Sequence, residues 1–172
     1  MMLVASMNPC PCGYYGSRVK PCRCGSHEIR KYLDRISGPL LDRIDIQTEV
    51  DAVAVEDIVK DTRQEGSAAV RERVQKARER QAARFEGTGI RTNAQMRGKN
   101  MEAQAQASPE ALALLQSAVK RYGLSMRAYT RLLKVARTIA DLRGGDSVSD
   151  EDMAEAVQFR IIDGKYWSQA HG

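Results

Sequence analysis

The clearest periodic pattern of hydrophobic positions lies in the C-terminal third of the chain, where it predicts three amphipathic helices. Ser108 is placed as the N-cap of the first helix, with proline and an acid next, and Gly123 ends it. Ser125 caps a second helix that runs to Gly144. Ser149, with an acid three residues later, has the spacing of a capping box for the third. The short connections between them favour a compact helical bundle.

The pattern changes twice in the middle of the chain. Residues 68–86 place apolar side chains on one side of a helix and Arg, Lys and Glu elsewhere, which predicts a long, largely exposed helix with Val70, Val74, Ala77 and Phe85 on its apolar side. Residues 87–107 contain three glycines and many Asn and Gln residues, so we expect a connector without regular structure.

The first fifty residues mix strand and helix signals. Leu3–Met7 is apolar and stops at Asn8-Pro9, which predicts a short buried strand that ends in a loop. A helix capped by Ser26 is expected over His27–Arg35, and strict alternation over Ile44–Val50 predicts a second strand. The fold class is therefore mainly α with a small β remnant. We expect a first domain over residues 1–66 and a helical domain over residues 67–172.

Composition narrows the class of protein. With 42% hydrophobic and 28% charged residues, the chain is expected to be globular and ordered. The opening apolar run is too short for a membrane span and lacks the basic region of a signal peptide. A cytoplasmic protein with no membrane partner is expected, and cytoplasmic cysteines are normally reduced.

The positive charge is concentrated in one part of the chain. The formal net charge is +5, but residues 67–143 carry 16 Lys/Arg against 6 Asp/Glu, a net charge of +10. This excess favours a polyanionic partner such as nucleic acid. The alternative is a well-solvated helix surface with no such partner.

All four cysteines fall in one window, as Cys10, Cys12, Cys22 and Cys24. Four thiolates can surround one zinc ion tetrahedrally, which is typical of a structural site and leaves no position open for catalytic water. Arg18, Lys20 and Arg23 are placed to offset the charge of such a site. Disulfides, a redox pair or free thiols are the alternatives, and His27 is either a substitute ligand or a surface residue.

Four segments carry a family resemblance: LVASMNPCPCGYYG, CRCG, SGPLLDRID and LSMRAYTRLLKVARTIADL. In this order they resemble the C-terminal portion of the magnesium-chelatase-like AAA+ ATPases, in the ComM/YifB-like branch of that family. The resemblance implies a partial AAA+ α/β core over residues 1–66, followed by an all-α helical lid bundle. It also implies ATP and Mg²⁺ as ligands of the intact protein, and identical subunits in a ring, expected to be a hexamer.

The resemblance assigns roles to three residues. Asn8 corresponds to sensor 1, which orients the attacking water, Arg43 to the arginine finger that reaches a neighbouring subunit's nucleotide, and Arg127 to sensor 2. From the residues alone, Asn8 is equally suited to cap a turn before proline, and Arg43 to pair with a neighbouring Asp. Arg131 and Lys134, further along the same helix, are expected on a solvated polar face.

The chain departs from the family in one respect. It has no phosphate-binding loop of the form G-x-x-x-x-G-K-[ST] and no apolar strand that ends in paired acids. We therefore expect a C-terminal fragment that does not hydrolyse ATP alone, from a parent that couples hydrolysis to DNA remodelling or branch migration. The alternative is a non-enzymatic, zinc-stabilised module that binds nucleic acid.

Overall fold

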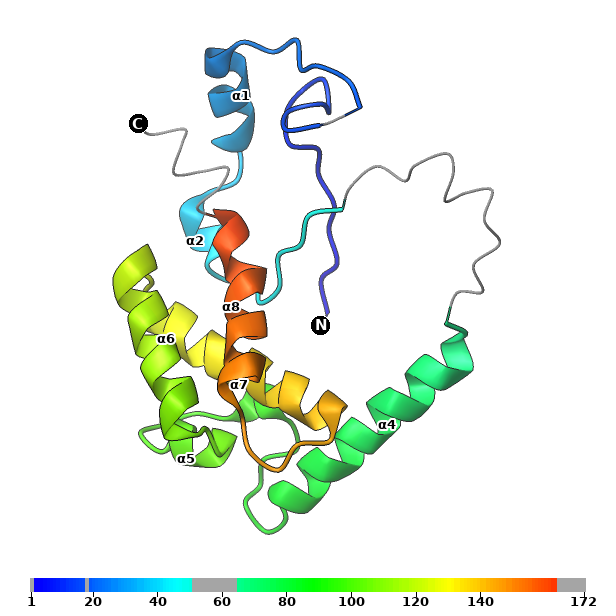
Figure 1. Cartoon of the computed structure of the whole chain (residues 1–172), viewed down its shortest axis with the longest axis vertical. Coiled ribbons are helices and arrows are strands. Elements are labelled where there is room, and N and C mark those ends of the chain that lie inside the picture. The colour runs from blue at the N-terminus through cyan, green and yellow to red at the C-terminus, as the bar shows by residue number, and fades with distance from the viewer. Residues whose placement is uncertain (1, 18, 51–64, 164–172) are drawn as a thin grey trace. The chain divides into compact units, whose positions relative to one another are not determined.

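The computed structural model describes residues 2–17, 19–50 and 65–163, with side chains described as far as Arg160. The chain divides into two compact units, one within Met1–Thr62 and Ile162–Gly172 and the other over Arg63–Ile161. Figure 1 shows the elements of both units. Each unit is described by itself below.

The described part of the first unit contains two helices joined by a short turn, α1 (Ser26–Leu33) and α2 (Gly38–Leu41). The backbone N–H of Gly25 donates to Glu28 Oε2 at 2.9 Å, so a first-turn carboxylate secures the start of α1. The helix predicted over His27–Arg35 is confirmed, but Gly25 rather than Ser26 occupies the N-cap position. Leu33 and Leu41 are the buried side chains of these helices.

The two predicted strands are not formed. Leu3–Met7 and Ile44–Val50 belong to no strand or sheet in the structure, and Val4, Ile46 and Val50 are 83%, 54% and 85% exposed. The expectation of a buried strand at Leu3–Met7 was therefore wrong. A strand is stabilised by hydrogen bonds to a neighbouring strand, and the described residues provide no sheet for either segment to join.

The second unit is helical, and its four long helices match the predicted ones. These are α4 (Ser67–Arg84), α6 (Pro109–Tyr122), α7 (Met126–Arg143) and α8 (Asp150–Asp163). The serine caps are confirmed, because Ser108 Oγ accepts from the backbone N–H of Ala111 and Ser125 Oγ from that of Ala128. The mainly α fold class is thus confirmed.

The segment predicted as an irregular connector is instead part of the core. It contains a 3₁₀ turn, η1 (Asn93–Gln95), and a short helix, α5 (Met101–Ala105). Met96 and Ala105 are fully buried, and Met101 is 8% exposed. The segment was predicted to be irregular because most of its residues are polar. Burial of its few apolar side chains in the core is what orders it.

Helix α7 lies at the centre of the second unit, where it contacts α4, α5, α6 and η1 (Figure 1). Its Leu133 and Ala136 are fully buried against Leu115 of α6 and Met153 of α8 in one hydrophobic cluster. An isolated parallel bridge between Ala107 and Val148 connects the turn before α6 to the turn before α8. The core therefore fixes both ends of α7 and the loops around them.

Candidate metal centre and candidate catalytic residues

The four cysteines of the first unit form one cluster. The Sγ atoms of Cys10, Cys12, Cys22 and Cys24 all lie within 4.8 Å of one another. Cys10 Sγ is 3.4 Å from Cys12 Sγ and 3.7 Å from Cys22 Sγ, and the Cys12–Cys22 separation is 3.5 Å. Tetrahedral zinc with Zn–S bonds of about 2.3 Å requires sulfurs about 3.8 Å apart. The four cysteines therefore could hold one metal ion.

The same distances speak against disulfides. A disulfide joins its sulfurs at about 2.05 Å, far closer than any pair here. All four thiols are free, with Cys10 buried and the other three partly buried. Of the alternatives left open by the sequence, the geometry favours a metal centre.

Local backbone geometry brings the first cysteine pair into place. The backbone N–H of Gly13 donates to the carbonyl oxygen of Cys10 at 3.0 Å and closes a turn around Cys12. Gly13 has a φ of +81°, a left-handed conformation that glycine adopts without steric cost. The backbone N–H of Tyr15 also points at Cys10 Sγ, 3.3 Å away. The glycine that follows Cys12 is thus a geometric requirement of the loop.

The cluster distributes its charge unevenly. A hydrogen bond from the backbone N–H of Arg23, with a second from Tyr14, lowers the pKa of Cys12 to about 6. Burial, with the neighbouring Cys12 and Cys10 sulfurs, raises the pKa of Cys24 to about 12. Like charges this close oppose one another, so a bound divalent cation would be needed for all four cysteines to be thiolates together.

His27 and the neighbouring basic residues lie outside the group of four cysteines. His27 is exposed at the start of α1 and is not part of the four-cysteine group. Lys20 lies over the ring of Tyr14, with Nζ 5.0 Å from the ring centroid, and Arg23 is exposed. Arg18 lies outside the described residues.

Asn8 lies directly beside the loop that carries the four cysteines. Its side chain is exposed, and a Cβ placed on Gly13 would be 3.7 Å from Asn8 Cγ, so the amide packs against this glycine. The loop therefore supports Asn8 from one side while leaving the amide accessible. An accessible amide offers both a donor and an acceptor.

Arg43 follows α2 and is also exposed. Its Nη1 donates to the carbonyl oxygen of Pro39 at 2.9 Å, four residues earlier. This contact holds one terminal nitrogen of the guanidinium against α2. Asn8 and Arg43 both belong to the first unit, whereas the third candidate catalytic residue, Arg127, belongs to the second.

Arg127 occupies the first turn of α7, where its side chain is exposed. A helix N-terminus presents backbone N–H groups and the positive end of the helix dipole, which suits an anion such as phosphate. Lys134, expected on a solvated face, is partly buried and donates from Nζ to the carbonyl oxygen of Ala94 at 2.7 Å. Lys134 thus fastens the η1 segment to α7.

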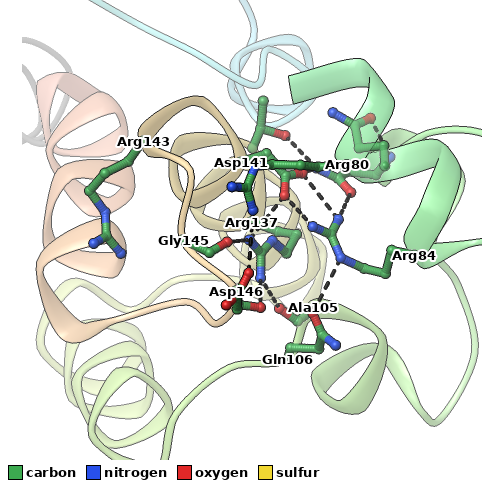
Figure 2. Close-up of polar contacts among 12 residues, drawn as sticks. Arg80, Arg84, Ala105, Gln106, Arg137, Asp141, Arg143, Gly145 and Asp146 are labelled. Carbon is green, nitrogen blue, oxygen red and sulfur yellow. Dashed lines mark hydrogen bonds and ion pairs between the residues drawn. The ribbon is translucent and has the colours of Figure 1, made fainter. Parts of the chain in front are cut away.

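A buried polar cluster in the second unit was missed by the sequence reasoning. Figure 2 shows Arg84 of α4 and Arg137 of α7 converging on the carboxylate of Asp141. Arg137 is fully buried, and its guanidinium also donates to the carbonyl oxygens of Asp146 and Gly145 at 2.9 and 2.6 Å. Asn93 Nδ2 donates to Asp141 Oδ2 at 2.8 Å. This cluster joins α4, η1, α7 and the turn before α8.

One sequence signal could have indicated this cluster. Arg137 and Asp141 stand four residues apart within the apolar stripe of α7, beside Leu133, Ala136 and Ala140. Charged residues in a buried stripe must be paired, because an isolated buried charge is strongly destabilising. The spacing indicates the pair within α7, whereas Arg84 is recognised only in the folded chain.

No helix among the described residues is long and apolar enough to cross a membrane.

The described fold is a helical unit accompanied by a segment that carries four clustered cysteines. The family described as magnesium chelatase, subunit ChlI C-terminal, matches residues 64–160, more than half of the chain. The family described as magnesium chelatase, subunit ChlI, matches residues 1–58. The chain therefore belongs to the magnesium chelatase ChlI family.

Individual relatives match over almost the whole chain. The competence protein ComM of Haemophilus influenzae is 40% identical over 162 residues, which cover 93% of this chain and 30% of ComM. YifB of Salmonella typhimurium is 37% identical over 162 residues, and YifB of Escherichia coli 38% over 165 residues. The match covers 94% of this chain and 31% of each YifB protein, so the chain spans less than a third of these relatives' length.

Proposed function

We propose that this chain supplies the nucleotide-sensing and lid portion of a ring-forming ATPase. Family membership over both units supports this function. The observation that carries it is that Asn8, Arg43 and Arg127, the three residues suited to a γ-phosphate, all present exposed side chains. The proposed assembly is a ring of identical subunits, expected to be a hexamer.

Each of the three residues has a distinct proposed role. The Asn8 amide orients the water that attacks the γ-phosphate, since it can donate and accept hydrogen bonds without titrating. Arg43 reaches the nucleotide of a neighbouring subunit and stabilises charge on the transferring phosphoryl group. Arg127 binds phosphate at the start of α7. The groups that hold Mg²⁺ and the β-phosphate are expected from the rest of the intact protein.

A chimera tests this function. We would replace the matching segment of Haemophilus influenzae ComM with this chain and measure ATP hydrolysis. The chimera is expected to hydrolyse ATP, and Arg43→Ala and Arg127→Ala are each expected to lower kcat by about 100-fold or more, because each removes charge stabilisation of the transition state. This chain alone is expected to show no hydrolysis.

Arg71→Ala is the matched control for the chimera, because Arg71 is an exposed arginine of α4 outside the proposed site. It should leave kcat within about 2-fold of the unsubstituted chimera. Equal activity of the Arg43, Arg127 and Arg71 variants would contradict the proposal. So would ATP hydrolysis by this chain alone that exceeds that of its Arg43→Ala/Arg127→Ala variant.

The cysteine cluster is proposed to hold structural zinc. Four sulfur ligands within 4.8 Å support this assignment, since thiolates favour zinc and leave no open coordination position. Protein purified without added zinc should carry close to one equivalent by elemental analysis, and Cys10→Ser/Cys24→Ser should carry none. His27→Ala is the control and should keep its metal. Fully reduced wild-type protein without metal would refute the assignment.

DNA is the proposed substrate of the intact protein, which we infer couples ATP hydrolysis to DNA remodelling or branch migration. The structure alters where positive charge is available for such a partner. Four of the six basic residues of α4 are paired with carboxylates: Arg73 with Glu65, Lys76 with Glu72, Arg80 with Asp146, and Arg84 with Asp141. Two of these carboxylates, Glu65 and Asp146, lie outside residues 67–143, so the positive charge available in that segment is lower than its net charge indicates.

A further inference from the structure

A second group of cations lies in the first unit, on α1 and the turn that follows it. We define the α1 cationic surface as the exposed residues His27, Arg30, Lys31 and Arg35. Together with Asp34 they line a shallow groove of about 290 Å³. None of the four cationic side chains forms an ion pair or a side-chain hydrogen bond within the described residues. This separates the surface from α4, whose cations are largely paired.

The spacing of these residues places them together. Positions 27, 30, 31, 34 and 35 follow the 3.6-residue helical period, so their side chains share one face. The opposite face carries Leu33, which is buried, with Ile29, Tyr32 and Ile36 partly buried. Packing of this apolar face keeps the cationic face in solvent. Eight residues of helical rise span about 12 Å, which matches about three phosphates along one DNA strand.

The loop that carries the four cysteines does not need the cations of α1 to balance its own charge. Zinc with four thiolates carries a net charge of −2, which the exposed Lys20 and Arg23 in the same loop can balance. Cys24 precedes the first residue of α1 by only two positions, so a bound metal would fix the start of the helix. The α1 cationic surface then faces outward on a rigid support.

We infer that the α1 cationic surface binds the phosphate backbone of duplex DNA. This inference rests on the proposed function, in which DNA is the substrate of the intact protein. Cationic side chains that outnumber the neighbouring carboxylates, here three Arg/Lys against Asp34, attract phosphate and release its counterions. The groove lining contains no Phe, Tyr or Trp on which unstacked bases could lie, which favours a duplex over a single strand. Contacts confined to phosphate carry no sequence preference.

The test measures binding of the full chain to a fluorescent 30-base-pair duplex of arbitrary sequence between about 50 and 200 mM salt. Arg30→Gln/Lys31→Gln/Arg35→Gln should lower the affinity by about 10-fold or more at the lower salt concentration. The slope of log K against log salt should become shallower by about 2.7, because each lost phosphate contact contributes about 0.9.

The control is Arg71→Gln/Lys76→Gln/Arg78→Gln, which removes the same charge from exposed positions of α4. It should change the affinity by about 2-fold or less. Equal losses in the two triple variants would overturn the inference. An unchanged affinity together with altered self-association of the α1 variant would also overturn it, because the surface would then bind a second copy of this chain.

A single substitution tests the same surface in the opposite direction and does not threaten the fold. Asp34→Asn removes the one carboxylate that lines the groove, so the affinity for the duplex should rise about 2- to 5-fold. An affinity that stays the same or falls would contradict the inference. Circular dichroism of the α1 triple variant should be unchanged, because the substituted side chains are exposed.

The ComM chimera separates this inference from the proposed function. Without DNA, the α1 triple substitution should leave its ATP hydrolysis unchanged, because no residue of the α1 cationic surface is assigned to the nucleotide. A chimera that never hydrolyses ATP, while the α1 substitutions still abolish duplex binding by this chain, would refute the ATPase and leave the inference standing. Normal ATP hydrolysis with duplex binding insensitive to these substitutions would refute the inference alone.

Discussion

The carboxylate of Asp141 is the point at which three segments of the second unit, α4, η1 and α7, meet. It is fully desolvated and accepts from Arg137 Nη2 at 2.9 Å and from Asn93 Nδ2 at 2.8 Å, and it pairs with Arg84. Such a pair stabilises little relative to an apolar replacement, but removal of one partner leaves a buried charge uncompensated. Asp141 is therefore the side chain whose charge the second unit most depends on.

Asp141→Asn is expected to lower the free energy of unfolding by about 3 to 5 kcal/mol, because Arg137 and Arg84 would share a site without a carboxylate. Urea denaturation followed by circular dichroism measures this change. Asp146→Asn is the control: it removes the partner of Arg80 at a fully exposed position and should change stability by about 0.5 kcal/mol or less. Similar losses in the two variants would contradict the assigned role of Asp141.

Asp152, at the start of α8, is a second buried carboxylate whose contribution to stability depends on pH. Burial raises the pKa of its carboxyl, but hydrogen bonds from Arg143 and from the backbone N–H of Ser149 outweigh burial and lower the pKa below its ordinary value. A depressed native pKa means that the carboxylate stabilises the fold above its unfolded pKa. That stability is lost as pH falls through the native pKa.

The expected stability loss in Asp152→Asn is therefore constant above about pH 5 and becomes smaller below about pH 4. Urea denaturation at several pH values gives the difference between the wild type and the variant. Asp150→Asn at the neighbouring exposed position is the control and should give a smaller difference at neutral pH. A difference that grows on acidification would show that the assigned sign is wrong.

At the residue scale, the sequence allows local sites to be predicted better than distant ones. The cysteine cluster could be predicted because its four ligands lie within 15 residues and their residue type restricts the chemistry. The Asp141 cluster could not, since Arg84 is 57 residues away along the chain. The roles of Asn8, Arg43 and Arg127 remain predictions from the family.

At the scale of elements, the long helices follow from signals at their own ends. Ser108→Ala and Ser125→Ala are each expected to destabilise the second unit by about 1 kcal/mol, because each leaves a backbone N–H of the first turn without its partner. Thermal or urea unfolding measures this loss. Ser117→Ala, at an exposed interior position of α6, is the control and should be neutral or slightly stabilising. A loss of the same size in Ser117→Ala would contradict the stabilising role of the two N-caps.

Two kinds of element were predicted incorrectly because their stability depends on contacts with distant parts of the chain. A strand depends on hydrogen bonds to a partner strand, so the alternation in Ile44–Val50 could not by itself fix its structure. Helix α5 has only five residues and would not persist alone in water, and it forms because Met101 and Ala105 are buried against α7. Local propensity contains no information about pairing with another strand or about burial against a distant helix.

At the scale of the whole molecule, the two units depend on different kinds of interaction. The second unit has a hydrophobic cluster that joins side chains from α5, α6, α7 and α8. Among the described residues of the first unit, the buried side chains are Cys10, Leu33 and Leu41. A structural metal commonly adds stability to a small unit, and we propose that the four cysteines provide such a site here.

Removal of the proposed metal is expected to loosen the first unit and leave the second intact. In hydrogen exchange, the amides of α1 should lose protection by about 10-fold or more after chelation, because an ion held by the four cysteines would fix the segment immediately before that helix. The amides of α7 should keep their protection, since the buried contacts of α7 do not involve the cysteines. Cys10→Ser/Cys24→Ser should reproduce the chelated pattern without chelator. Equal loss of protection in α1 and α7 would show that the metal stabilises the whole chain, and no change in α1 would show that the first unit folds without it.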